Sequence, residues 1–265
     1  MYIIGMSWKD KPTIISNFRK DNMYVFIDES GSIHDFGACC KAIKHRKPIE
    51  LRDQTFALNA IIMDGRNLMR TKQSFSRLKL EFFNADDFHF HANEMGSSAD
   101  GRYHKLGSYR LAALKHDINT ILSNTHYYQN AVFCNKQHVF SDPNYLLNPK
   151  LAVEEIYKTL FQAIEKKLKK IGAKATLVIE GTSSPKLDNL ILRFFLQQQS
   201  EHLLPHCCYC YFSTKASPSY PSGLEVADLT AAPIFSLAKY DYSLILHKHL
   251  SFPKLTDGDI ISFSR

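Results

Sequence analysis

The sequence lacks long apolar runs and the spacing patterns of several common protein classes. No stretch is long and apolar enough for a membrane helix, and charged residues interrupt every apolar run in the first 22 residues, which argues against a secretory signal. Neither a P-loop nor a dinucleotide-binding fingerprint occurs, and G-x-S-x-G is also missing, which argues against a serine hydrolase. We therefore expect a cytoplasmic protein that makes no contact with a membrane.

Cysteine is present, but its spacing is irregular. The six cysteines are Cys39, Cys40, Cys134, Cys207, Cys208 and Cys210. Adjacent pairs do not form a disulfide framework, and no second pair of ligands follows at zinc-finger spacing. Alternation along a strand places Cys208 and Cys210 on one face, and Cys207 and Tyr209 on the other. We predict free thiols that pack as small apolar side chains in a reducing compartment.

Acidic residues are outnumbered by basic ones. Lysine and arginine total 33 against 26 aspartate and glutamate, so the formal net charge is +7. This excess is compatible with a polyanionic partner such as RNA or DNA. The basic residues that could contact a phosphate backbone are Lys166, Lys167, Lys169 and Lys170, with Arg66, Arg70, Lys72, Arg77 and Lys79. For each of them alone, a solvated helix face is the alternative interpretation.

Hydrophobic periodicity predicts a mixed α/β protein with one central sheet. The predicted strands are 23–28, 36–44, 55–63, 126–134, 175–180 and 207–214. The predicted helices are 66–82, 109–122, 151–171, 186–199 and 223–238. Residues 85–108 are expected to form a loop with a short strand, and 141–149 a turn-rich segment. We expect an irregular extension over 1–22 and a single domain over 23–265.

Three carboxylates occupy similar places in this layout. Asp28 ends the strand 23–28, Glu180 ends the strand 175–180, and Asp228 lies in a helix rich in small residues. Residues just beyond strand ends line the functional crevice of an open α/β sheet, and a helix with small residues can approach the sheet closely. Solvated acids at strand ends are common, so each one alone carries little weight. Together, the three are predicted to converge.

A divalent cation would resolve the repulsion between such acids. Clustered carboxylates are costly to bury without a counter-charge, and magnesium prefers hard oxygen ligands together with substrate phosphate. The sequence therefore predicts a Mg²⁺ or Mn²⁺ site. Glu29 follows Asp28 directly, so pleat alternation points it to the opposite face and excludes it from this site. Asp188 is interpreted as an exposed helix residue.

Five segments carry a family resemblance. They read DESGS, FALNAIIMD, HFHANEM, LVIEGTSSPKLDNL and SGLEVADLTAA, in this order along roughly residues 23–240. The chain resembles the bacterial and phage family named domain of unknown function 3800, which is regarded as ribonuclease-H-like. The resemblance implies a central sheet with three early antiparallel strands, later parallel strands and flanking helices. It also implies metal-dependent nuclease or integrase-like chemistry, with Asp28, Glu180 and Asp228 as the matching acids.

The middle acid of the family pattern is replaced in this sequence. The family often has a glutamate two residues before a histidine-alanine pair, and this position is His89, ahead of His91. Either His89 replaces the acid, or Glu94 or Glu81 supplies it. Histidine is a softer ligand that suits manganese or zinc better than magnesium. The predicted ligands are thus the three acids with Glu94, His91 or His89, while a polar loop is the alternative for the histidines.

These observations predict a divalent-metal-dependent nuclease or a related phosphodiester-transfer enzyme. Asp28, Glu180, Asp228, Glu94 and His91 are its predicted catalytic residues. The first alternative is a non-catalytic module that binds nucleic acid or protein on the same fold, which the substitution by histidine favours. The second is a metal hydrolase acting on small phosphoesters through the histidine pair.

Overall fold

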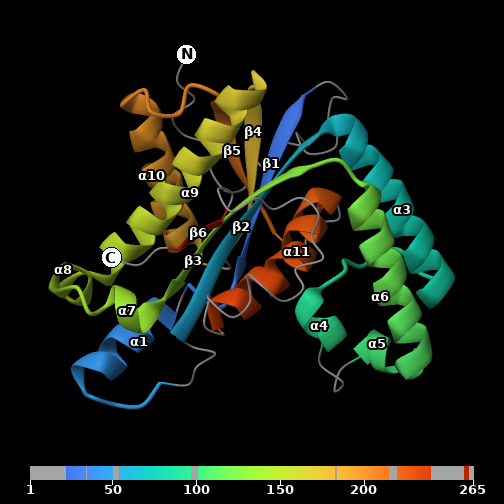
Figure 1. Cartoon of the computed structure of the whole chain (residues 1–265), viewed down its shortest axis with the longest axis horizontal. Helices are drawn as coiled ribbons and strands as arrows, with labels where there is room; N and C mark the ends of the chain where they lie inside the picture. The colour runs from blue at the N-terminus through green and yellow to red at the C-terminus, as the bar shows by residue number, and fades with distance from the viewer. Residues whose placement is uncertain are drawn as a thin grey trace.

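The computed structural model describes residues 22–33, 35–49, 54–96, 101–182, 184–214, 220–239 and 260–262. Within these residues the chain forms a mixed sheet with helices on both faces (Figure 1). The strands are β1 (Met23–Ser30), β2 (Thr55–Asp64), β3 (Tyr128–Asn135), β4 (Ala175–Glu180), β5 (Cys207–Ser213) and β6 (Ile260–Ser262). The long helices are α1 (Asp35–Lys44), α3 (Gly65–Phe83), α6 (Gly107–Asn124), α9 (Pro149–Ile171), α10 (Pro185–Ser200) and α11 (Ser222–Lys239). The short helices are α4 (Ala92–Gly96), α5 (Gly101–His104), α7 (Lys136–Val139) and α8 (Pro143–Leu147).

The strand order of the sheet is β5-β4-β1-β2-β3-β6. Strand β2 is antiparallel to both of its neighbours, β1 and β3. Strand β4 then pairs with β1 in parallel, and β5 is parallel to β4. The three-residue strand β6 adds in parallel to β3. The predicted α/β class, with early antiparallel and later parallel strands, is confirmed.

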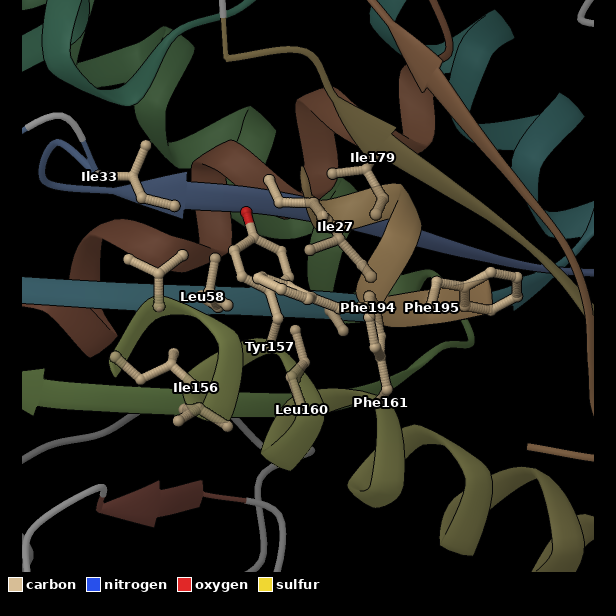
Figure 2. Packing of buried hydrophobic residues seen from close by; sticks show 14 of the residues in the cluster. Ile27, Ile33, Leu58, Ile156, Tyr157, Leu160, Phe161, Ile179, Phe194 and Phe195 are labelled. Carbon is tan, nitrogen blue, oxygen red and sulfur yellow. The ribbon is translucent and has the colours of Figure 1, made fainter. Parts of the chain in front are cut away.

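One face of the sheet is covered by α1, α9 and α10. Their apolar side chains meet those of β1, β2 and β4 in a large buried cluster. Figure 2 shows Tyr157 and Leu160 of α9 against Ile27 and Leu58 of the sheet, with Phe161 beside the two phenylalanines of α10. Helix α9 ends at Gly172, whose φ of 65° suits a residue without a Cβ. Gly172 was the predicted stop of this helix.

The opposite face is covered by α3, α6 and α11 (Figure 1). Strand β1 alternates between the two faces, since Ile27 belongs to the first cluster and Phe26 to the second. In β4, Ile179 and Val178 divide in the same way. A residue two positions after Phe26 in β1, or two positions after Val178 in β4, therefore lies on the face that α11 covers.

The predicted strand over 36–44 is wrong, because this segment is the helix α1. The apolar residues Phe36, Cys39, Cys40 and Ile43 follow the spacing i, i+3, i+4, i+7 of one helical face. The first three are buried and Ile43 packs against the same cluster. The strand prediction used the apolar content of the segment and overlooked its period.

Two further segments differ from the predictions. The described part of 85–108 contains α4 and α5 and no strand, and the turn-rich segment 141–149 contains α8. The other predicted strands and helices are present, with ends displaced by no more than a few residues. The predicted extension over 1–22 lies outside the described residues except for residue 22. None of the described helices has the length and apolarity needed to cross a membrane.

All six cysteines are free, as predicted. Cys39, Cys40, Cys134 and Cys207 are buried, and burial raises the pKa of the Cys134 thiol to about 12. The prediction for β5 is wrong in one detail. Ala175 pairs with Cys207 but Thr176 pairs with Tyr209, so Cys208 is an extra residue in β5. This irregularity puts Cys207 and Tyr209 on opposite faces.

Candidate functional site

Asp28 and Glu180 lie side by side on the face of the sheet that α11 covers. Each follows a buried residue of that face by two positions, Phe26 for Asp28 and Val178 for Glu180. The parallel register pairs Ile27 with Ile179, so the two acids occupy the next positions along neighbouring strands. Asp28 is only 2% exposed. The ends of β1 and β4 therefore place two carboxylates next to each other.

Helix α11 approaches this face closely because its first turns carry small residues. A Cβ added at Gly223 would lie 2.2 Å from the ring of Phe26, so only glycine permits the observed contact. Ala227 is fully buried. The amide of Asn59 on β2 donates to the Ala227 carbonyl at 2.7 Å and accepts from Gln129 on β3 at 2.8 Å. This buried polar pair fixes the helix over the sheet.

Asp228 extends from α11 toward the segment that precedes α4. Its Oδ2 accepts a hydrogen bond from the backbone N–H of Ala92 at 2.7 Å, and Nδ1 of His91 lies 3.4 Å from the same oxygen. Both side chains are mostly buried. His91, one of the predicted ligands, is thus brought to one of the predicted acids.

The hydroxyl of Tyr220 contacts one of the three predicted acids. This hydroxyl donates to Oε1 of Glu180 at 2.9 Å. Burial raises the pKa of Tyr220 most, and the negative charges of Glu180, Asp28 and Asp228 raise it further. The hydrogen bond joins Tyr220 to Glu180, and the parallel register of β1 and β4 places Asp28 next to Glu180. The convergence of all three acids on one cation stays a prediction. Tyr220 carries no motif, so sequence reasoning did not identify it.

His89 packs against Tyr220 and lies near a further carboxylate. Its ring packs against that of Tyr220 with centroids 4.2 Å apart, and its Nδ1 lies 4.0 Å from Oε1 of Glu225. The two predicted histidines therefore lie near two carboxylates that are one helical turn apart on α11. His91 is beside Asp228, and His89 is beside Glu225.

Glu225 is a second residue that sequence reasoning missed. It is 3% exposed, and its Oε1 accepts from Lys79 Nζ at 2.6 Å and from the backbone N–H of Phe90 at 2.8 Å. Burial raises the pKa of the Glu225 carboxyl, and the charge of Lys79 opposes this shift. Glu225 and Asp228 thus hold the backbone of residues 90–92 at two N–H groups. The spacing of three residues along α11 was a possible signal for this pair of contacts.

The Lys79→Met substitution is expected to lower the free energy of unfolding by about 3 to 5 kcal/mol, because it leaves the Glu225 carboxylate buried without its cation. A raised pKa means that the folded state holds the Glu225 proton more tightly than the unfolded chain does. The loss is therefore smallest at acidic pH, where the carboxyl is protonated in both states, and grows as pH rises through the folded pKa. Urea denaturation at mildly acidic and neutral pH measures both effects.

Lys72 provides the matched control, because it is an exposed lysine of the same helix. The Lys72→Met substitution should change stability by no more than about 0.5 kcal/mol. Equal losses for the two lysines would show that the buried pair contributes nothing.

The remaining predicted acids are placed differently. Glu94 is exposed on α4, and its charge acts on the buried hydroxyl of Tyr103. Glu81 is exposed near the end of α3. The prediction that Asp188 is an exposed helix residue is wrong. It is buried and accepts from the N–H and the hydroxyl of Thr182 at 2.9 and 2.7 Å, so it holds the turn that follows Glu180.

Glu29 points away from this site, as predicted. Glu29 pairs with Leu58 of β2, whose side chain belongs to the buried cluster on the α9 side of the sheet. The basic residues also divide between the two sides. The lysines of α9 lie on the side opposite the carboxylates, and Lys167 packs over the ring of Tyr128 at 4.8 Å. The prediction that Lys79 contacts a phosphate backbone is wrong, because this side chain is buried against Glu225.

The donor set suits a hard divalent cation, since it consists of carboxylate oxygens on a rigid sheet and helix. Tyr220 already donates to Glu180 within this set. Among the residues that the structure describes, no group of three histidine, cysteine, aspartate or glutamate side chains is arranged to hold a metal ion. The register brings Asp28 and Glu180 together, but the described side chains do not form a coordination group.

Comparisons of the chain with family models, with curated proteins and with solved structures gave no match. Any function must therefore be argued from the geometry of this site and from the sequence.

Proposed function

We propose that this chain is a divalent-metal-dependent nuclease or a related phosphodiester-transfer enzyme that acts on RNA or DNA. One observation carries the proposal. Asp28 and Glu180, far apart in the sequence, lie side by side on neighbouring strands of the face that α11, the helix of Asp228, covers. The net charge of +7 favours a polyanionic substrate.

The topology supports a ribonuclease-H-like fold within this proposal. Three antiparallel strands followed by β4 and β5 in parallel, in the order β5-β4-β1-β2-β3, match what the resemblance to the domain of unknown function 3800 family implies. Helices cover both faces of the sheet, which also agrees with that fold. Membership of the family is part of the proposal.

Each residue has a distinct role in this proposal. Asp28, Glu180 and Asp228 would hold Mg²⁺ or Mn²⁺, and His91 beside Asp228 would be a further ligand. Such a cation, when bound, would activate the attacking hydroxyl and stabilise the leaving oxygen of a phosphodiester. Tyr220 orients Glu180 through its hydrogen bond. Glu225 and Asp228 hold the backbone that carries both histidines.

Cleavage of labelled nucleic acid tests this function. The wild-type protein is expected to cut end-labelled RNA or DNA with Mg²⁺ or Mn²⁺, and to lose this activity with a chelator. Glu180→Gln purified in the same way should be inactive, which excludes a contaminating nuclease. Absence of cleavage of both polymers under every metal condition would refute the proposal, as would equal cleavage by the variant.

A second function is favoured by a specific observation. The described residues contain no group arranged to hold a metal ion, and a histidine stands at the middle acid of the family pattern. A module that binds nucleic acid without cutting it would show tight binding that neither metal nor chelator changes. That result, with no cleavage, would select this alternative.

A further inference from the structure

Two tyrosines of β5 form an aromatic surface that the proposed chemistry does not use. Tyr209 is 61% exposed and Tyr211 is half-buried. Their ring centroids lie 6.3 Å apart with an angle of 25° between the ring planes, so the two rings are stacked. Strand β5 is at the edge of the sheet. An exposed ring with a half-buried, nearly parallel neighbour is suited to bind flat aromatic groups.

The extra residue in β5 determines which face these rings occupy. Cys207 packs in the core on the α9 side, and without an extra residue Tyr209 would face that core as well. Because Thr176 pairs with Tyr209, beyond the extra Cys208, the tyrosine faces the side of Val178 and Glu180. Bulges occur often beside functional sites, where they redirect a side chain.

The register places the rings in line with the candidate site. Ser213 pairs with Glu180, Tyr211 pairs with Val178, and Tyr209 pairs with Thr176. Along the strand direction, Tyr211 therefore lies about 7 Å from the level of Glu180, and Tyr209 about 13 Å. Among the described residues, α11 packs chiefly on β1 and β2, and on this side of β5 Tyr209 is exposed while Tyr211 is half-buried. A linear ligand could follow β5 from the tyrosines to the carboxylates.

We propose that Tyr209 and Tyr211 stack the bases of a single-stranded RNA or DNA whose backbone reaches Asp28 and Glu180. This inference rests on the proposed function, because it names the form of nucleic acid that the site accepts. Bases of a single strand expose their aromatic faces, whereas bases of a duplex are stacked on one another. Stacking on an aromatic side chain contributes about 1 to 3 kcal/mol per base. The net charge of +7 attracts the backbone without regard to sequence.

Fluorescence anisotropy tests the inference with a labelled oligouridine of about twelve nucleotides, with chelator present so that binding is measured without cleavage. Tyr209→Ala and Tyr211→Ala are each expected to weaken binding by about 5- to 100-fold. Tyr209→Phe should retain the affinity, because the ring remains. Tyr109→Ala is the matched control, since Tyr109 is 87% exposed on α6 and should not affect binding. Binding to a duplex of equal length should not depend on the tyrosines.

The outcomes separate this inference from the proposed function. Cleavage by a wild-type protein whose single-strand affinity is unchanged in the double alanine variant overturns the inference and leaves the function standing. Tyrosine-dependent binding without cleavage in any metal supports the inference and removes the function. A wild-type protein that does not bind single strands also overturns the inference. The inference is also overturned if the wild-type protein is a dimer and the double alanine variant is a monomer with unchanged affinity for the single strand. In that case β5 would be a contact between two copies of the chain.

Discussion

Replacing Gly223 with alanine is expected to lower the free energy of unfolding by more than about 4 kcal/mol. The added Cβ would lie 2.2 to 2.4 Å from three atoms of the Phe26 ring, far below any real carbon–carbon contact. The ring is fully buried against α11, so it has no free space to occupy. The helix would have to move off the sheet, at an expected cost above about 4 kcal/mol. Because total stabilities are about 5 to 15 kcal/mol, this loss is a large part of the free energy that keeps the protein folded.

Soluble yield, circular dichroism and urea denaturation measure this effect. Gly37→Ala is the matched control, because nothing lies within 4 Å of a Cβ added to that glycine of α1. Alanine in a helix interior is expected to stabilise the protein there by about 0.5 to 1 kcal/mol. Phe26→Ala should partly rescue Gly223→Ala by removing the ring, so the double variant should lose less stability than the sum of the two single losses. Normal stability of Gly223→Ala would contradict the close contact of α11 with the sheet.

The parts of the fold that follow local patterns could be predicted from the sequence. The apolar runs 55–63 and 175–180 are strands, and the apolar residues of 151–171 recur at helical spacing over many turns. The helix α1 was missed because its apolar residues Phe36 to Ile43 span only two turns and include two adjacent cysteines. A short apolar segment is compatible with a strand or with a helix until its period is counted.

Only those acids of the candidate site that lie at the ends of strands could be predicted from the sequence. Asp28 and Glu180 could be placed on one face from strand alternation and the expected parallel pairing. The contacts of Glu225 with Lys79 and Phe90 span more than 130 residues of sequence, and no local pattern reports them. The same holds for the extra residue in β5, because a one-residue change of register leaves no signal in composition. The hydrogen bond from Tyr220 to Glu180 is likewise a tertiary contact that no local pattern reports.

Replacing Asp28 with asparagine is expected to reduce nucleic-acid cleavage by about 10³-fold, which corresponds to about 4 kcal/mol of transition-state stabilisation. The substitution retains the shape of the side chain but removes the charge that lies next to Glu180. Mn²⁺ binding, measured by calorimetry without nucleic acid, should weaken by at least about tenfold, because an amide is a poorer ligand than a carboxylate. Stability without metal should not fall, since the substitution relieves repulsion between Asp28, Glu180 and Asp228.

Glu29→Gln is the sharpest control for this prediction, because the two acids are adjacent in β1 but face opposite sides of the sheet. Glu29 pairs with Leu58 of the α9-side cluster, so its loss should leave both Mn²⁺ affinity and cleavage within about twofold of wild type. A general loss of negative charge at the end of β1 would instead affect both variants equally. Equal cleavage by Asp28→Asn and wild type would show that Asp28 has only a structural role, and the nuclease proposal would have to be given up. Loss of activity in Asp28→Asn alone, at undiminished stability, can arise only if the α11 face of β1 is the one that performs the chemistry.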